Sequence, residues 1–191
     1  MRKVIVSNIV SVDGFIAGPQ GEINWFAWNE ETADYCKEML ASVGIILFGR
    51  VTYELMAGYW PTEMAVKGDA VVARFMNGKP KLAFSRTLKK ADWANTRLVK
   101  EDPAKVVAAL KQQPGKDLMI FGSANLAATL IKHGLIDEYQ VMINPLVLGR
   151  GRPLFQGVRD RLHLQLVSTR VFRVGNVLLT YKPKPETQPA H

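Results

Sequence analysis

Cysteine and long apolar runs are both scarce in this 191-residue sequence. The single cysteine, Cys36, cannot form an internal disulfide, and disulfides are typical of secreted proteins. No apolar segment approaches the ~20 residues that a membrane-spanning helix needs. The chain opens on Met-Arg-Lys and passes at once into an alternating apolar pattern, which is unlike a secretory signal segment. We therefore expect a cytoplasmic protein that does not span a membrane.

The residue arrangements of hydrolases and metal sites are also missing. The three histidines, His133, His163 and His191, show no metal-ligand spacing, and no Gly-x-Ser-x-Gly sequence is present to carry a nucleophile. Cys36 falls within a helical pattern, where a small core residue is more common than a nucleophile. These absences disfavour hydrolysis and metal chemistry. A reaction whose difficult step belongs to a bound cofactor needs fewer protein groups, and hydride transfer is the plainest example.

Acidic residues are too few to balance the basic ones, so the formal net charge is +8. Clustered Lys and Arg would indicate nucleic-acid binding, but the basic residues are spread over the chain and lie close together only in pairs such as Lys89-Lys90 and Arg150 with Arg152. The sequence also has no helix-turn-helix or RNA-binding aromatic signature. It therefore disfavours a nucleic-acid partner, and favours a positive field that captures an anionic cofactor or a phosphorylated substrate.

One domain is the expected organisation, because 191 residues with 48% hydrophobic content suffice for a sizeable core. Strand-like runs cover residues 3–11, 45–48, 81–84, 117–121, 139–146, 163–172 and 176–181. Helical spacing covers residues 30–42, 51–57, 65–77, 103–111 and 124–133. This alternation predicts an α/β three-layer sandwich with a mixed, mostly parallel sheet, and the last two runs predict an added antiparallel hairpin. The domain is expected to span residues 1–182, followed by a disordered, proline-rich tail at 183–191.

Two strands run directly into a glycine and then into a helix, at Gly49 and at Gly122. Glycine lets the backbone approach a phosphate closely, and the first-turn N–H groups of a helix lack helical partners. In the first turn Arg50 would clamp a phosphate and Thr52 would donate a hydroxyl; in the second, Ser123 would cap the helix or donate to a pyrophosphate. One such turn is more often only a stable helix start. Two of them favour a dinucleotide across the edge of the sheet, although neither matches the Gly-x-Gly-x-x-Gly fingerprint.

Two further segments bear on the same site. Ser85 and Arg86 follow a strand and would deliver a hydroxyl and a guanidinium to a cofactor phosphate, although a solvated strand end is as common. Residues 12–29 form a long connection with three glycines ahead of an aromatic group around Trp25. A long glycine-bearing loop inside a compact domain is more often a lid or binding loop than filler.

Taken together, these segments resemble a known family. In order along the chain, the motifs are Ser11-Val-Asp-Gly-Phe-Ile-Ala-Gly18, Gly49-Arg-Val-Thr-Tyr-Glu54, Tyr59-Trp60-Pro61, Phe84-Ser-Arg-Thr-Leu88, Gly122-Ser-Ala124, Gly134-Leu-Ile-Asp-Glu-Tyr139 and Pro145-Leu-Val-Leu-Gly-Arg-Gly-Arg-Pro-Leu-Phe155. Their order and spacing resemble the dihydrofolate reductase family, in particular stand-alone proteins similar to the reductase domain of bifunctional riboflavin-biosynthesis enzymes. The resemblance covers the chain to about Lys182.

The resemblance implies a dihydrofolate-reductase-like fold that uses NADPH. In that family the first glycine turn and the next strand end hold the adenosine phosphates, which carries over to Gly49, Arg50, Thr52, Ser85 and Arg86. The second turn holds the pyrophosphate, which carries over to Gly122, Ser123, Ala124, Asn125 and Leu126. The loop after the first strand covers the nicotinamide, which places Ile9, Ile16, Ala17 and Trp25 beside the reacting carbon.

The resemblance also bears on the substrate. Dihydrofolate reductase places a carboxylate in its first helix to assist protonation of the pterin, and Asp34 is the nearest candidate here, although a solvated aspartate fits the pattern as well. The riboflavin-pathway reductases usually have an acidic residue just before the second glycine turn, where this chain has Phe121. We therefore expect an NADPH-dependent reductase of a small heterocyclic, pterin- or aminouracil-like substrate.

Two alternative functions and one partner complete these expectations. The alternative enzyme is a 5-amino-6-(5-phosphoribosylamino)uracil reductase of riboflavin biosynthesis, and the alternative from another class is a nucleotide-binding module without turnover. The apolar segment 139–148 and the C-terminal hairpin each present an edge or face that suits a twofold copy. The family resemblance points to a homodimer as well.

Overall fold

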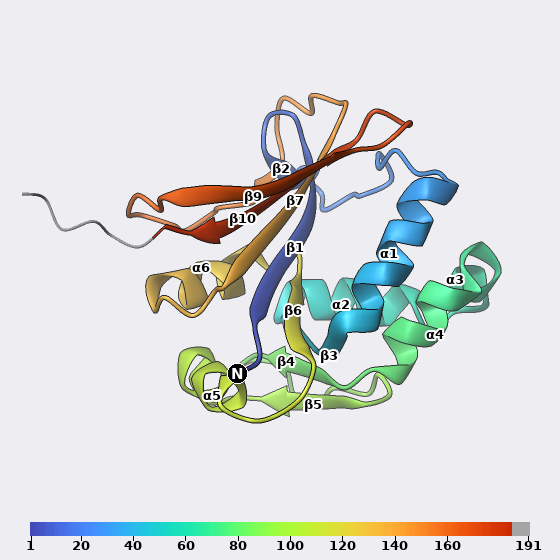
Figure 1. Cartoon of the computed structure of the whole chain (residues 1–191). Coiled ribbons are helices and arrows are strands. Elements are labelled where there is room, and N and C mark those ends of the chain that lie inside the picture. The colour runs from blue at the N-terminus through green and yellow to red at the C-terminus, as the bar shows by residue number, and fades with distance from the viewer. Residues whose placement is uncertain (185–191) are drawn as a thin grey trace, which may run out of the picture.

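An eight-stranded sheet lies at the centre of the computed structural model, which describes residues 1–184 (Figure 1). From one edge to the other, the strands are β5 (Thr96–Val99), β4 (Lys81–Phe84), β3 (Val43–Gly49), β6 (Asp117–Phe121), β1 (Val4–Ser11), β7 (Glu138–Asn144), β10 (Val177–Pro183) and β9 (Leu164–Val171). Neighbouring strands from β5 to β7 are parallel, and β10 is antiparallel to both β7 and β9. The predicted mixed sheet with its C-terminal hairpin is therefore confirmed.

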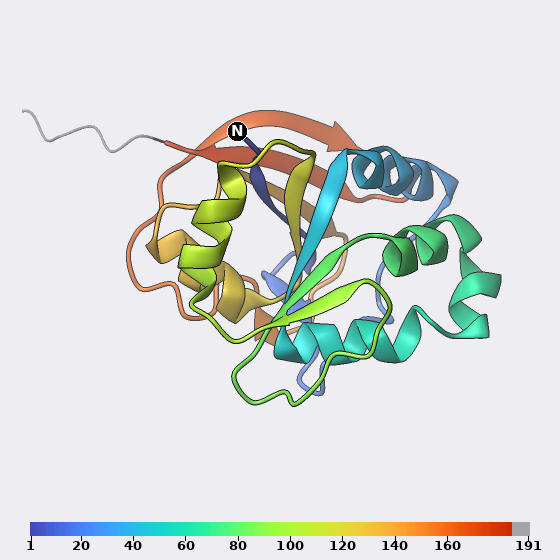
Figure 2. The same ribbon diagram turned by 90° about the horizontal axis from the view of Figure 1, so that it is seen from below.

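Helices cover both faces of this sheet, as the two views in Figures 1 and 2 show. One face carries α1 (Glu30–Ser42), α2 (Arg50–Tyr59), α3 (Glu63–Gly68) and α4 (Ala70–Gly78), and the other carries α5 (Pro103–Lys111) and α6 (Ala124–Lys132). Each face buries its own apolar cluster, built around Phe48 and Met119 on the first and around Leu118 and Leu130 on the second. The arrangement is the predicted three-layer sandwich. None of the helices within residues 1–184 is long and apolar enough to cross a membrane.

The elements differ from prediction in three places before the C-terminus. The single helix expected over residues 65–77 is two helices, because the Asp69 carboxylate accepts hydrogen bonds from the N–H groups of Val71 and Val72 and so begins α4 after α3 has ended. Strand β5 was not predicted, since a four-residue strand at the edge of a sheet leaves little periodic signal. A small second sheet, formed by β2 (Phe15–Ala17) and β8 (Arg152–Pro153), was also missed.

The C-terminal boundary lies slightly beyond the expected one. Strand pairing continues through Pro183, which lies opposite Leu164, and the Lys184 N–H donates to the carbonyl of His163. The rest of the predicted tail, residues 185–191, lies outside the described residues.

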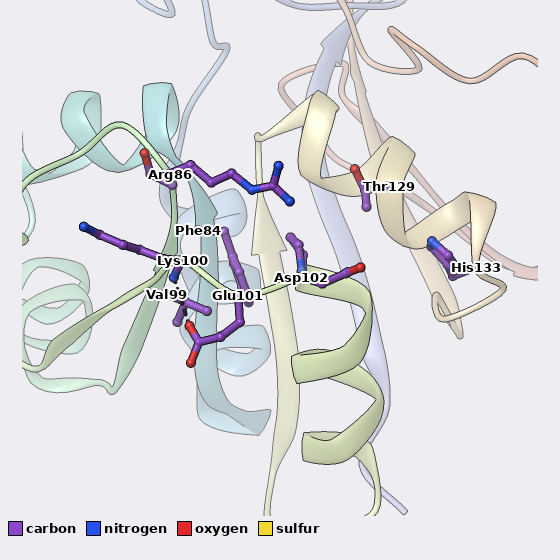
Figure 3. A pocket seen from close by; sticks show the side chains of 10 residues that line it. Phe84, Arg86, Val99, Lys100, Glu101, Asp102, Thr129 and His133 are labelled. Atoms are coloured by element: carbon purple, nitrogen blue, oxygen red, sulfur yellow. Dashed lines mark hydrogen bonds between the residues drawn. The ribbon is translucent and has the colours of Figure 1, made fainter.

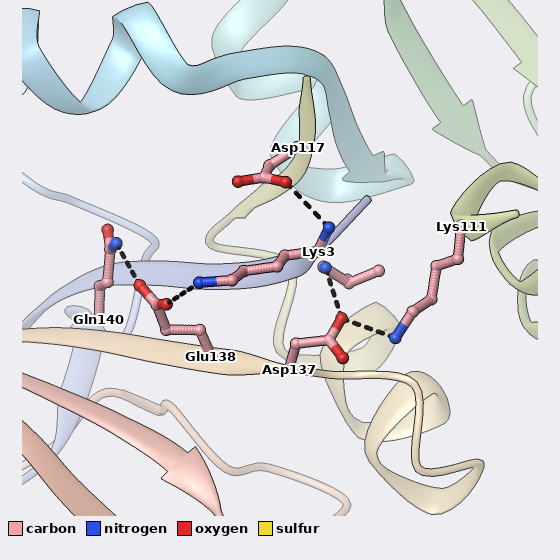
Figure 4. Close-up of polar contacts among 7 residues, drawn as sticks. Lys3, Lys111, Asp117, Asp137, Glu138 and Gln140 are labelled. Carbon is pink, nitrogen blue, oxygen red and sulfur yellow. Dashed lines mark hydrogen bonds and ion pairs between the residues drawn. The ribbon is translucent and has the colours of Figure 1, made fainter. Parts of the chain in front are cut away.

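Two aspartates hold the first residues of β1 between its neighbours (Figure 4). Asp117 accepts a hydrogen bond from the Lys3 N–H at 2.9 Å, and Asp137 accepts one from the Val4 N–H at 2.8 Å. Asp137 also pairs with the ammonium of Lys111, a largely buried side chain, at 2.6 Å. These contacts secure the register of β1 against β6 and β7, and therefore the position of its carboxyl end.

Candidate functional site

The two glycine turns lie side by side, because β3 and β6 are adjacent parallel strands whose carboxyl ends reach the same edge of the sheet. The Gly49 N–H donates to Ser123 Oγ at 2.9 Å, and the Ser123 N–H donates to Thr52 Oγ1 at 3.0 Å. Each turn therefore supplies a side chain that holds the backbone of the other. The residues that the sequence predicted as two separate phosphate sites form one connected cluster.

The second turn has an uncommon backbone conformation. Gly122 and Ser123 both have left-handed backbones, with φ of 59° and 56°. A Cβ atom added at Gly122 would lie 3.2 Å from Cγ2 and 3.3 Å from Oγ1 of Thr52, so a glycine is needed for space as well as for conformation. A left-handed serine is strained and persists only where its surroundings hold it. Here Thr52 binds its N–H, and its carbonyl accepts from Ala127 at 2.9 Å.

Several hydrogen-bond donors at this cluster have no protein partner. The N–H groups of Ala124, Asn125 and Leu126 open α6, and none of them donates to a group within residues 1–184. The hydroxyls of Thr52 and Ser123 act as acceptors only, so both hydroxyl protons stay available among the described contacts. The first-turn N–H groups of α2 lie across from them and likewise lack a side-chain cap. Donors at two helix N-termini favour an anion such as a phosphate.

The serine of the second turn does not play the capping role that the sequence also allowed. Ser123 stands at the N-cap position of α6, yet its side chain makes no capping hydrogen bond to that helix and binds Gly49 instead. The N–H groups of Gly49 and Gly122 are likewise taken by protein acceptors. The two glycines therefore contribute space and backbone shape, while the free donors lie one to four residues further along.

A cleft of about 320 Å³ lies at the same carboxyl edge of the sheet, between the ends of β4 and β5, the start of α5 and the C-terminal half of α6 (Figure 3). Arg86 extends from the loop after β4 toward α6, where Thr129 and His133 line the opposite wall, and it forms no ion pair within residues 1–184. Two carboxylates, Glu101 and Asp102, also line the cleft, and each already accepts a hydrogen bond from a nearby backbone N–H. The unpaired guanidinium makes the cleft suitable for an anionic group.

The other two residues predicted for this end of the site have local partners. Ser85 Oγ accepts from the N–H groups of Thr87 and Leu88 and so shapes the turn from which Arg86 departs. Arg50 is exposed on α2 and pairs with Glu54 at 2.8 Å. An exposed pair at this helical spacing is worth only about 0.3–0.5 kcal/mol, so a phosphate would displace the Glu54 carboxylate at little cost.

The residues predicted to cover the nicotinamide lie at the end of β1 and in the loop that follows it. Ile16 and Ala17 belong to β2, and Trp25 donates from its indole to the carbonyl of Glu22 at 3.1 Å. Ile9 lies within β1 and packs against a small apolar cluster that includes Phe172. The structure therefore places all four on or beside the loop 12–29, at the carboxyl edge of β1.

Side chains that sequence reasoning missed hold this loop at both ends. Asp13 accepts from the N–H groups of Leu148 and Gly149, and hydrogen bonds from Ser11 and from these two groups lower its pKa below the usual value. At the other end, Asn144 Oδ1 accepts from the Ala27 N–H at 2.6 Å, and the buried Asn176 donates to the Ala27 carbonyl at 2.9 Å. The loop is thus tied to the segments around β7 and β10.

Few of the described side chains near the glycine turns could serve as a proton donor or as a metal ligand. Asp34 lies on the exposed side of α1 and pairs with Lys37 at 2.8 Å, whereas Thr32 and Leu40 form the buried side of that helix. We therefore do not retain Asp34 as a proton donor. Within residues 1–184, no group of three or more His, Cys, Asp or Glu side chains is arranged to hold a metal ion.

Comparison with known proteins places the chain in a family. The model of the RibD C-terminal domain matches residues 2–178. The uncharacterized protein YyaP of Bacillus subtilis (strain 168) is 34% identical over 184 residues, which is 94% of each chain.

Solved structures share the fold at lower identity. A putative riboflavin biosynthesis protein from Shewanella sp. PV-4 has a TM-score of 0.74 at 23% identity, with 95% of this chain and 99% of that chain covered. Dihydrofolate reductase from Enterococcus faecalis, solved in complex with NADP(H) and RAB-propyl, has a TM-score of 0.64 at 14% identity, with 95% and 96% covered. The predicted dihydrofolate-reductase-like fold is confirmed. Because the family model spans nearly the whole chain, this protein belongs to the RibD C-terminal domain family.

Proposed function

We propose that this chain is a cytoplasmic NADPH-dependent oxidoreductase that reduces a small heterocyclic, pterin- or aminouracil-like compound. The observation that carries the proposal is the joined pair of glycine turns with free N–H and hydroxyl donors, together with a cleft at the same edge of the sheet that contains the unpaired Arg86. This spacing of anion sites suits a dinucleotide with an extra ribose phosphate. The Enterococcus faecalis dihydrofolate reductase, which shares the fold, was solved with NADP(H).

The residues present fit this cofactor group by group. The N–H groups of Ala124, Asn125 and Leu126 would hold the pyrophosphate, and Arg50 and Arg86 would hold the adenosine phosphates. When bound, NADPH supplies the hydride. The carboxylates near the site, Glu54, Glu101 and Asp102, already have protein partners, so the protein contributes mainly orientation and exclusion of water by the loop 12–29.

The position just before the second turn favours an unphosphorylated acceptor. Phe121 is half-buried and packs against the apolar cluster that contains Met119. An apolar ring at this position offers no charge or hydrogen bond to a sugar phosphate. We therefore favour a flat heterocycle over 5-amino-6-(5-phosphoribosylamino)uracil as the substrate.

Loss of absorbance at 340 nm tests the activity, with NADPH and a panel of pterins, aminouracils, quinones and nitro compounds. Turnover of a pterin or an unphosphorylated aminouracil supports the proposal. Turnover of the phosphoribosylated aminouracil alone would favour the riboflavin-pathway enzyme. Tight binding of NADPH without any turnover would favour a nucleotide-binding module, and failure to bind NADPH would contradict the proposed function outright.

Arg86 is expected to select NADPH over NADH. A charge-assisted bond to the extra phosphate is worth roughly 1.5–3 kcal/mol, so Arg86→Ala should weaken NADPH binding about 10- to 150-fold and leave NADH binding unchanged. Isothermal titration calorimetry measures both. Arg74, exposed on α4 and outside the cleft lining, provides the control, since Arg74→Ala should alter neither affinity. Equal wild-type affinities for the two cofactors would refute this role.

We also propose that the protein forms a homodimer through its C-terminal hairpin. Strand β9 is the outermost strand of the sheet, and Leu166 and Val171 on it are 51% and 68% exposed. Light scattering should give twice the 21.3 kDa chain mass, and Val171→Lys should shift the mass toward the monomer. Val66→Lys, at an exposed valine of α3, is the matched control. A wild-type monomer at micromolar concentration would contradict the proposal.

A further inference from the structure

Asn8 is a buried polar residue in the interior of β1. It is 7% exposed, and Val6 and Val10, its neighbours on the same face of the strand, are core residues. Its Oδ1 accepts a hydrogen bond from the Gly122 N–H at 2.8 Å. Its Nδ2 is shielded from solvent and has no hydrogen-bond partner among residues 1–184.

Fold stability alone does not account for an asparagine here. A buried amide donor without a partner is unfavourable, and the positions on either side of Asn8 on this face are filled by valine. What the carboxamide does provide is an acceptor for one particular N–H group. That group belongs to the left-handed Gly122, directly before Ser123 and the free donors that open α6.

The contact is one of three hydrogen bonds that hold the second turn from two sides. Thr52 and Ser123 link the turn to the start of α2, and Asn8 links it to β1. Without Asn8, the Gly122 N–H would have no acceptor among residues 1–184. An anion site that is already held in its binding shape avoids an ordering cost when the ligand arrives.

We propose that Asn8 is a positioning residue for the dinucleotide, which it serves by fixing Gly122 so that the N–H groups at the start of α6 converge on the pyrophosphate. The inference rests on the proposed function, because it takes a dinucleotide as the ligand of this turn. Asn8 acts through the backbone of Gly122 and needs no contact with the ligand.

The first test compares two ligands on Asn8→Leu. NADP⁺ spans both turns, whereas adenosine 2′-monophosphate lacks the pyrophosphate and the nicotinamide half and depends mainly on the cleft with Arg86. Because the leucine removes the acceptor of the Gly122 N–H, NADP⁺ should bind about tenfold more weakly, while the affinity for adenosine 2′-monophosphate should change less than about twofold. The melting temperature should change little, since removal of the unpaired Nδ2 offsets the loss of an acceptor for the Gly122 N–H.

A second variant, Asn8→Asp, separates positioning from a general loss of structure. One carboxyl oxygen can still accept from Gly122, but the ionised group brings a negative charge close to the phosphates. Compared with wild type at the same pH, NADP⁺ binding should therefore be weakest at about pH 8 and should improve as the pH falls, because protonation removes the negative charge. Val6→Ala, on the same face of β1, is the matched control: it should lower the melting temperature and leave both affinities unchanged.

The outcomes are distinguishable. Wild-type NADP⁺ affinity in a folded Asn8→Leu protein would overturn the role of Asn8 alone, and so would an equal loss for both ligands. If Asn8→Leu does not fold, the pH dependence of Asn8→Asp decides: recovery at low pH for NADP⁺ supports the role, and its absence overturns it. A wild-type protein that binds neither NADP⁺ nor NADPH would overturn the proposed function itself.

Discussion

Replacing Gly122 by alanine is expected to weaken NADPH binding by about a hundredfold or more, the largest effect on affinity that we predict. The added Cβ would lie 3.2 Å from Thr52 Cγ2 and would push apart the two turns that these residues join. The N–H groups of α6 would then no longer converge with those of α2. A left-handed backbone also costs a non-glycine residue roughly 1–2 kcal/mol, so some stability should be lost as well.

Gly134 provides a control that separates these two effects. Its φ is 63°, close to the 59° of Gly122, but nothing lies within 4 Å of the Cβ that alanine would add. Gly134→Ala should therefore show a similar loss of stability with unchanged affinity. Calorimetric titration and thermal unfolding on the same samples measure both quantities. If the folded Gly122→Ala protein binds NADPH as well as Gly134→Ala does, the second turn is no phosphate site.

Replacing Asp137 by alanine is expected to lower the free energy of unfolding by about 3 kcal/mol, the largest effect on stability that we predict. The Lys111 side chain is only 9% exposed, and without Asp137 its ammonium keeps a single acceptor, the carbonyl of Leu135. The Val4 N–H would lose its acceptor as well. The cost is large because a charge and a donor would both remain buried without their partner.

The neighbouring residue supplies the matched control for this prediction. Glu138 pairs with Lys3 at 3.3 Å, but the Lys3 side chain is 59% exposed, so Glu138→Ala should cost less than about 1 kcal/mol. Chemical denaturation of both variants gives the two free energies. Similar losses of unfolding free energy in Asp137→Ala and Glu138→Ala would show that burial of Lys111 does not strengthen its pair with Asp137.

The layered fold and both glycine turns could be predicted because their signals are local. Apolar residues at a spacing of two or of three to four indicate strands and helices wherever the chain places them. Asp102 and Pro103 begin α5, and Asn29 with Thr32 forms a capping box at α1, through contacts only two or three residues apart. Gly49 and Gly122 each follow a buried strand, and parallel pairing then brings the two turns to one edge. Sequence alone thus determined the architecture and the edge that carries the candidate site.

Tertiary structure decided which side chains support that site. Asn8 binds Gly122 across 114 positions and Asn144 binds Ala27 across 117, so no local pattern distinguishes these asparagines from any others. The helical phase of α1 turns Asp34 to solvent, which its sequence position alone did not reveal. The role of Ser123 also depends on strand pairing. Its hydroxyl could cap its own helix, but it accepts a hydrogen bond from the adjacent turn instead, because pairing brings the Gly49 N–H within 2.9 Å. Contacts between distant segments form only once the sheet is assembled, so no regular spacing in the sequence indicates them.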